Sequence, residues 1–294
     1  MSLNITIIGC GEVGYAYAEA ISKIGYKLQL CTPRPSERIL KLASDNNIKL
    51  HKQFGDWLNN TDIVICCTPG SAALSVAKEV VLFLKKGALF ADFSTTSPEN
   101  KIKAASLARS KEISFVDVAI MGSVNLHQAS TPLLFAGNET EKIVTVMQKI
   151  GATIRVLENG KVGDAAFIKL LRSIFMKGLS ALTIECVVAA QYYGVKELLY
   201  ETLSDLNQTP ISEFLDMFLR HHVVHACRQR HEVAEAAQQL KSSGLPLQML
   251  PAIEDLFATT CEFIKMDPID HKNPTTEEAL VWLLKTRRSK KSTQ

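Results

Sequence analysis

Ile5-Thr6-Ile7-Ile8-Gly9-Cys10-Gly11-Glu12-Val13-Gly14 is the stretch that decides the fold of the first half of this chain. An apolar, β-branched run leads into the spacing G-x-G-x-x-G, and a helical pattern follows over residues 15–24. In such a turn the first glycine permits a tight bend, the second lets the backbone approach a pyrophosphate, and the third lets the helix pack close to the strand. We therefore predict a dinucleotide site at which Gly9, Cys10, Gly11, Glu12, Val13 and Gly14 offer backbone N–H groups to phosphate. A purely structural glycine turn is the alternative.

The composition indicates a folded chain with room for two domains. Its 294 residues are 47% hydrophobic and can supply sizeable cores. Five basic residues and no acidic residue stand in the last ten positions, so the net charge of +3 becomes −2 for residues 1–284. We expect no nucleic-acid role for this slightly acidic body, and we expect residues 286–294 to form a disordered basic tail.

The seven cysteines form no C-x-x-C pair and no set with zinc-ligand spacing. An odd count in a chain without a signal peptide favours a reducing cytoplasm. Charged residues or glycine interrupt the longest apolar tracts before about 18 residues, so the sequence predicts no membrane span.

Short β-rich runs alternate with amphipathic patterns through the first 160 residues. This alternation predicts a doubly wound α/β domain of the Rossmann type over residues 1–160, with its ligand at the carboxyl ends of the strands. The predicted strands are residues 5–9, 27–31, 62–67, 88–93, 114–118, 133–136 and 153–156, and the predicted helices are residues 14–24, 35–44, 71–84, 98–110 and 139–150.

The strand pattern stops near Gly160, and residues 161–285 are predicted to form an all-α substrate and dimerisation domain. Its helices are expected at residues 161–193, 198–206, 211–239 and 247–266. The first of them is apolar on all sides, so we expect it to be buried, either in a domain core or against a partner subunit.

Two loops at predicted strand ends could carry chemistry. Residues 92–98 contain several hydroxyl side chains, among them Ser94 and Thr95, and end in a proline at a predicted helix start. They could contact a nicotinamide carboxamide or a substrate, or they could simply cap the helix. Residues 117–123 end in Gly122 and Ser123, which could hold a small carboxylate or belong to an ordinary connecting loop.

A lysine inside the long apolar helix is the third candidate. Lys169, Ser173, Lys177 and Ser180 fall on one helix face. Because burial disfavours an ammonium, it would lower the pKa of Lys169 towards the range that is useful for proton transfer. A structural salt bridge, or a lysine that reaches solvent, is the alternative.

Taken in order, these elements resemble the β-hydroxyacid dehydrogenase family, which includes 3-hydroxyisobutyrate dehydrogenase and the nucleotide-binding domain of the 6-phosphogluconate dehydrogenase type. The resemblance covers residues 3 to about 194. It rests on G-x-G-x-x-G, on D-x-S-T-x-x-P at residues 92–98, on D-x-x-x-x-G at residues 117–122, and on G-x-x-x-x-x-K at residues 163–169. The remainder resembles the helical C-terminal domain of a less characterised branch.

The resemblance implies hydride transfer between a nicotinamide and the carbinol carbon of a small, anionic hydroxy acid. Lys169 falls on the family's catalytic lysine, a general base in oxidation and a general acid in reduction. The resemblance further places Ser173 four residues after that lysine, Ser94 and Thr95 at the nicotinamide, and Met121, Gly122 and Ser123 at the substrate carboxylate. By their charge, Arg172 and Lys177 could bind a second anionic group, or they could be solvated or salt-bridged. Two departures separate this chain from better-known members, because those carry Ser-Gly-Gly at residues 121–123 and Asn at position 173. The usual substrate therefore does not transfer.

The cofactor is expected to be NADP. Thr32, and no carboxylate, stands at the end of the second predicted strand, where NAD sites place an acid. Arg34 and Arg38 follow and suit a 2′-phosphate, although Glu37 could still serve NAD. Thr68 and Pro69, after the third predicted strand, are also assigned to the cofactor site.

Residues 220–231 gather four histidines and three arginines. These residues could bind a metal, form a polar helix face or contact an anion. Because no carboxylate follows at a zinc-ligand position, no metal is predicted. The resemblance implies a homodimer. Two rival functions are an imine reductase, although such members tend to replace the lysine with Asp or Tyr, and a non-catalytic NADP-binding regulator.

Overall fold

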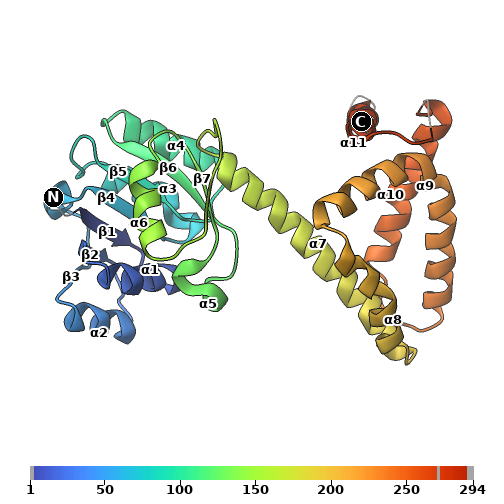
Figure 1. Cartoon of the computed structure of the whole chain (residues 1–294), viewed down its shortest axis with the longest axis horizontal. Helices are drawn as coiled ribbons and strands as arrows, with labels where there is room; N and C mark the ends of the chain where they lie inside the picture. Colours follow the sequence, from blue (N-terminus) through green and yellow to red (C-terminus); the bar gives the residue numbers. More distant parts are fainter. Residues whose placement is uncertain (1–2, 270–271, 290–294) are drawn as a thin grey trace. The chain divides into compact units, whose positions relative to one another are not determined.

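The computed structural model describes residues 3–269 and 272–289. Its contacts divide the chain into two compact units, residues 1–174 and 175–294, and the division falls inside the long helix α7, Asp164–Tyr192 (Figure 1). The sequence analysis placed the boundary at residue 160, just before this helix.

The first unit is built on a sheet with the strand order β3-β2-β1-β4-β5-β6-β7-β8 within the described residues. All neighbouring strands are parallel except β6 and β7. The strands are β1 Asn4–Ile8, β2 Lys27–Cys31, β3 Lys49–His51, β4 Ile63–Cys66, β5 Leu89–Asp92, β6 Ser114–Ile120, β7 Leu133–Ala136 and β8 Ile154–Val156. This confirms the predicted doubly wound domain.

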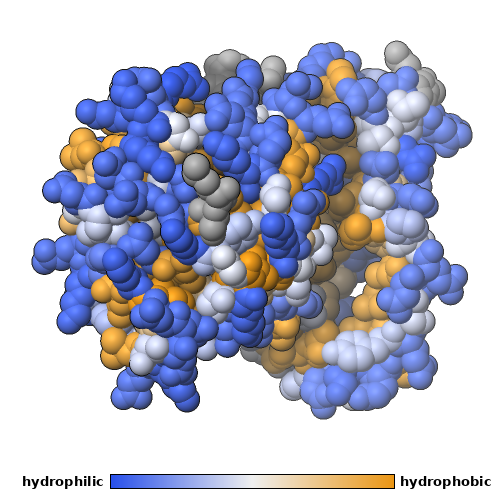
Figure 2. Space-filling view, turned by 60° about the vertical axis from the view of Figure 1, so that its left-hand side comes forward, coloured by the Kyte–Doolittle hydropathy of each residue, from blue (hydrophilic) through white to orange (hydrophobic). Residues whose placement is uncertain are grey.

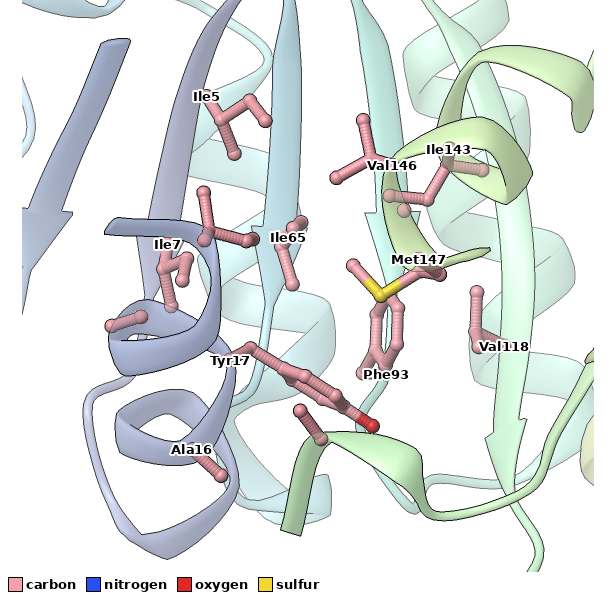
Figure 3. Close-up of a cluster of buried hydrophobic side chains, with 14 of the residues drawn as sticks. Ile5, Ile7, Ala16, Tyr17, Ile65, Phe93, Val118, Ile143, Val146 and Met147 are labelled. Carbon is pink, nitrogen blue, oxygen red and sulfur yellow. The ribbon is translucent and has the colours of Figure 1, made fainter. Parts of the chain in front are cut away.

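Helices cover both faces of the sheet because its central strands are apolar on both sides. One face packs on α1, α2, α5 and α6, and the other packs on α3 and α4. Figure 3 shows part of the first core, in which the ring edge of Tyr17 meets Phe93 at a centroid distance of 5.3 Å. These helices are α1 Glu12–Ser22, α2 Glu37–Asp45, α3 Gly70–Val80, α4 Pro98–Arg109, α5 Val124–His127 and α6 Glu141–Lys149, with 3-10 turns at Asp56–Asn60 and Gln128–Ser130.

The sequence analysis missed a short strand, a short α-helix and the two 3-10 turns of this unit. Strand β3 has three residues, lies at the sheet edge and contains two polar side chains, so it has neither the length nor the apolar run of a buried strand. Helix α5 is a single turn. The seven predicted strands and five predicted helices all form, with ends shifted by a few residues.

The second unit is helical, as predicted. It contains the rest of α7, α8 Lys196–Thr202, a 3-10 turn at Leu203–Gln208, α9 Ile211–Lys241, α10 Met249–Met266 and α11 Thr276–Ser289. Its core joins α9 to α11 through Val223, Ala279, Trp282 and Leu283. Helix α11 includes residues 286–289, which the sequence analysis assigned to a disordered tail; residues 290–294 lie outside the described residues.

A disulfide joins Cys227 of α9 to Cys261 of α10. The sequence analysis proposed no cysteine pairing, and two cysteines that are 34 residues apart carry no local pairing signal. Five cysteines are free thiols, and the reducing compartment stays a prediction.

Helix α7 is much more exposed than the sequence analysis expected. Only 11% of its most apolar 18-residue window is buried, which rules out the domain-core alternative for the described chain. By length and composition alone α7 could cross a membrane, and the expectation that the chain has no membrane span stays a prediction. Hydrophobic residues at the molecular surface appear in orange in Figure 2.

Candidate active site

The G-x-G-x-x-G turn lies between β1 and α1, and two of its glycines are required by the protein itself. Gly9 has φ +85°, and a Cβ there would lie 2.8 Å from the carbonyl oxygen of Cys67. A Cβ on Gly14 would lie 2.0 Å from the carbonyl oxygen of Gly9. Gly11 differs, because a Cβ there would meet no atom within 4 Å. The space above Gly11 is thus open, as a site for an approaching pyrophosphate requires.

This turn stands at the topological switch point of the sheet. The chain winds outwards from β1 through β2 to β3, and then from β4 in the opposite direction, so β1 and β4 are neighbours whose following helices lie on opposite faces. The first N–H groups of α1 have no intrahelical partner and suit an anion. Thr68 and Pro69 lie beside this crevice, at the end of β4. The residues present therefore fit a dinucleotide.

The end of β2 presents the residues that are expected to face the ribose. Thr32 is buried and donates its N–H to the carbonyl oxygen of His51 at 3.0 Å. Arg34 is exposed. Arg38 lies over the Tyr15 ring, with its Cζ atom 4.6 Å from the ring centroid.

A cavity of about 420 Å³ opens at the carboxyl ends of β5 and β6. Four of the residues assigned to the site line it: Ser94, Thr95, Lys169 and Ser173. The structure thus brings together side chains from a strand-end loop and from α7 that lie about 75 residues apart in the sequence. The Ser94 hydroxyl is buried and has no hydrogen-bond partner within the described part of the chain. A buried hydroxyl at a cavity wall is available to a bound molecule.

Lys169 and Asp117 are the titratable residues that line this cavity in the described part of the chain. The Nζ of Lys169 donates to Thr95 Oγ1 at 2.9 Å. Burial of the ammonium and repulsion from Lys101 lower the pKa of Lys169 to about 8, and Asp117 opposes them. Near neutral pH the amine can therefore exist both with and without its proton, as a general acid and base requires.

Gly70, the first residue of α3, fixes the loop that holds Thr95. A Cβ on Gly70 would lie 1.9 Å from the carbonyl oxygen of Thr95, so only glycine fits between this loop and α3. Because Gly70 follows Thr68 and Pro69 directly, the Thr95 loop and the switch-point crevice are adjacent. The sequence analysis had not identified this role.

A buried ion cluster that the sequence analysis also missed lies beneath the cavity. The Nζ of Lys101 lies 3.2 Å from Asp92 Oδ2 and 3.2 Å from Asp117 Oδ1, and all three side chains are at most 2% exposed. Lys101 shares the inner face of α4 with Ala104, Ala105 and Ala108. The sequence did contain a signal for this cluster, because Lys101 falls on the same helix face as three alanines, a face that such a pattern predicts to be buried.

Other assigned residues do not line this cavity. Met121 donates its N–H to the carbonyl oxygen of Pro132, and a Cβ on Gly122 would lie 3.2 Å from Cγ2 of Thr131. Arg172 and Lys177 are exposed, and Lys177 belongs to the second unit. Cys10 is buried, and burial raises the pKa of its thiol to about 12, which leaves no thiolate nucleophile there at neutral pH.

The histidine and arginine segment at residues 220–231 lies on α9. His222 contacts Thr260 of α10 at 2.8 Å, the rings of His221 and His225 meet edge to face at a centroid distance of 5.9 Å, and Arg228 pairs with Glu232. Within the described residues, no three His, Cys, Asp or Glu side chains are grouped closely enough to hold a metal ion.

Comparisons with known proteins find family matches for two stretches of this chain. Residues 4–159 match the NAD binding domain of 6-phosphogluconate dehydrogenase, and residues 190–260 match a domain of unknown function, DUF1932. An uncharacterised 28.5 kDa protein of Methanothermus fervidus is 30% identical over 87% of this chain and 98% of its own length. The 2-(hydroxymethyl)glutarate dehydrogenase of Eubacterium barkeri is 25% identical over 70% of this chain and 68% of its own.

Two solved structures share the fold. A conserved protein of unknown function, described as structurally similar to 3-hydroxyacid dehydrogenases, has a TM-score of 0.61 and 26% identity over 88% of this chain and 97% of its own. An imine reductase variant from Myxococcus stipitatus, in complex with NAD+, has a TM-score of 0.76 over 96% of this chain and 100% of its own, at 17% identity. At that identity the likeness concerns the fold alone.

Proposed function

Because the chain belongs to the family that has the NAD binding domain of 6-phosphogluconate dehydrogenase, we propose that it is a nicotinamide-dependent oxidoreductase acting on a small hydroxy acid or its carbonyl counterpart. The observation that carries this proposal is Lys169, whose amine is held at Thr95 inside a cavity next to the switch-point crevice. The similarity to the 2-(hydroxymethyl)glutarate dehydrogenase of Eubacterium barkeri supports the substrate class.

The chain's own groups account for the proton movement. The nicotinamide, when bound, accepts or supplies the hydride. In oxidation, neutral Lys169 takes the proton of the substrate hydroxyl; in reduction, the ammonium returns a proton to the carbonyl oxygen. Thr95 holds the amine by its hydroxyl, so the lone pair is directed before substrate arrives.

The remaining assignments follow from the same proposal. Ser94 supplies an unsatisfied hydroxyl at the cavity, and Ser173 lies one turn after Lys169 on the same wall. Gly122 and Ser123 are proposed to bind the carboxylate of the substrate, which the family resemblance supports. NADP is the proposed cofactor, since the residue at the end of β2 is Thr32 rather than an acid.

The proposal is tested with hydroxy acids, sugar acids, carbonyl compounds and cyclic imines, assayed by nicotinamide absorbance. We expect turnover of a hydroxy acid or its carbonyl partner, and we expect Lys169→Ala to abolish it while cofactor affinity in calorimetry changes less than about threefold. Lys111→Ala, an exposed lysine at the amino edge of the sheet, is the matched control.

Two outcomes would contradict the proposal. Turnover of imines alone would indicate an imine reductase, as the fold likeness permits. Tight cofactor binding without turnover of any compound, together with a biological role that survives Lys169→Ala, would indicate a regulator.

A further inference from the structure

We propose that Lys101 is a positioning residue for Lys169, because its buried ammonium joins the loop that carries Thr95 to the helix turn that precedes Lys169. The inference rests on the proposed function for the importance of Lys169. The contacts themselves lie within the first unit and involve residues that the proposed chemistry does not use.

The first side of this junction is the end of β5. Lys101 Nζ donates to the carbonyl oxygen of Asp92 at 2.7 Å and lies 3.2 Å from Asp92 Oδ2. The other carboxylate oxygen of Asp92 accepts the N–H of Ser94 at 2.9 Å. Lys101 therefore fixes both the backbone and the side chain of the residue from which the Thr95 loop departs.

The second side is the start of α7. Lys101 Nζ lies 3.2 Å from Asp117 Oδ1, and Asp117 Oδ2 accepts the N–H groups of Gly163 at 3.1 Å and Ala166 at 3.0 Å. Lys169 follows Ala166 by three residues and so stands one turn further along the same helix. Asp117 thus sets the register of the helix that presents the amine.

Charge explains why a lysine is needed at the junction. Asp92, the last residue of β5, and Asp117, in the middle of β6, are register partners on neighbouring strands, and both are buried. Without a cation between them, two carboxylates in a low dielectric repel each other until one takes up a proton or moves. Either change releases one of the two contacts, and the Lys169 amine then loses its fixed place at Thr95.

A buried ion cluster adds little stability compared with apolar packing of the same volume, so stability alone does not account for it. The charged groups that face Lys169 are Lys101 from α4 and Asp117 from β6, with Asp92 of β5 in the same cluster. Repulsion by Lys101 lowers the pKa of Lys169 and attraction by Asp117 raises it. The cluster therefore acts on the position of the amine and on its protonation.

The test measures Lys169 directly in the full-length protein. Competitive acetylation with acetic anhydride across pH 6–11, read by mass spectrometry, gives the titration midpoint of each lysine without any substrate or cofactor. We expect Lys101→Met to raise the Lys169 midpoint by about one pH unit and Asp117→Asn to lower it. Lys103→Met, on the exposed face of the same helix, is the matched control and leaves the midpoint in place.

A kinetic readout accompanies the labelling. Lys101→Met is expected to lower kcat at least about tenfold with little change in KM, and to shift the pH profile of kcat by the same amount as the labelling midpoint of Lys169. Lys101→Arg, which keeps the positive charge, is expected to retain part of the kcat that Lys101→Met loses. If Lys101→Met does not fold, Lys101→Gln combined with Asp92→Asn keeps neutral hydrogen bonds at the junction and is measured instead.

The outcomes separate the two proposals. An unchanged Lys169 midpoint and pH profile in a folded Lys101 variant, with only a lower Tm, would overturn the positioning role even if the wild-type enzyme turns over hydroxy acids. A shifted midpoint in a protein that turns over none of them would support the positioning of Lys169 while the proposed function fails.

Discussion

At the scale of single residues, the protonation of Lys169 connects the structure to measurable rates. Burial and the neighbouring Lys101 bring its pKa to about 8, below the 10.5 of a free lysine. Oxidation needs the neutral amine and reduction needs the ammonium. We expect kcat/KM for oxidation to rise with pH through a midpoint near 8 and kcat/KM for reduction to fall through the same midpoint, in stopped-flow or steady-state assays.

The same pKa fixes the sign of a stability effect. Between pH 8 and 10.5 the unfolded chain binds more protons at Lys169 than the folded chain does. The Lys169 ammonium therefore destabilises the folded chain fully below pH 8, and this destabilisation fades as the pH rises to 10.5. Lys169→Met should therefore raise the Tm most at pH 7 and least at pH 10. A Tm difference that does not depend on pH would contradict the lowered pKa.

A second prediction at this scale concerns the cofactor. Arg34 is exposed just beyond β2, where a ribose 2′-phosphate would need a cation. Arg34→Ala is expected to weaken NADP binding about 10- to 100-fold and to leave NAD binding nearly unchanged, because a charge-assisted hydrogen bond to phosphate is lost. Calorimetric titration of both cofactors measures this, with Arg109→Ala on α4 as control. Tighter binding of NAD than of NADP by the wild type would refute the preference.

At the scale of secondary-structure elements, the disulfide determines how firmly α9 and α10 are joined. Cys227 and Cys261 close a loop of 34 residues, and the chain-entropy model assigns such a loop about 3–4 kcal/mol of stabilisation. We expect reductant to lower the urea midpoint of the wild type and to have no effect on the Cys227→Ser, Cys261→Ser double variant.

Cys186, an exposed free thiol on α7, provides the control. Cys186→Ser should keep the full sensitivity to reductant. If the urea midpoint of the wild type is the same under oxidising and reducing conditions, the two sulfur atoms are not bonded in solution.

Helix α7 shows where element prediction succeeds and where it stops. Its existence and approximate length follow from a long apolar run that begins near Gly163 and ends before Gly194. Its environment does not follow, because an apolar helix is equally compatible with a core, a partner or a membrane. The exposed surface of α7 in the described chain removes the first of these.

At the scale of the whole molecule, the apolar surface of α7 predicts self-association. Phe167, Leu171 and Ile174 are exposed in the first unit, and Ile184 and Val188 are exposed in the second. Monomeric proteins rarely expose such surface. We propose that a second copy covers it, and we expect light scattering to give twice the 32.4 kDa of one chain.

Replacement of Ile184 and Val188 by Glu should convert the dimer to monomers, whereas Leu82→Glu, an exposed residue after α3, should not. A monomeric wild type at micromolar concentration would refute the dimer. Flotation of the purified chain with lipid vesicles would show instead that α7 meets a membrane, against the expectation from the sequence.

The sequence by itself determined the sheet, the glycine turn and the catalytic candidate. Each is a local property: a run of β-branched residues, a spacing of glycines that the turn requires, and a lysine at a fixed distance from a helix start. The order of these motifs along the chain led to the family resemblance. The matches over residues 4–159 and 190–260 confirmed that resemblance.

Only the tertiary structure decided what surrounds these residues. Lys101, Asp92 and Asp117 come from α4, β5 and β6, and the Cys227–Cys261 bond joins two helices. No local pattern in the sequence specifies which distant charge or thiol will meet another. The pKa of Lys169 depends on such contacts, since the field at an amine is set by the distance to each charge and by the exclusion of water, which exist only in the folded chain.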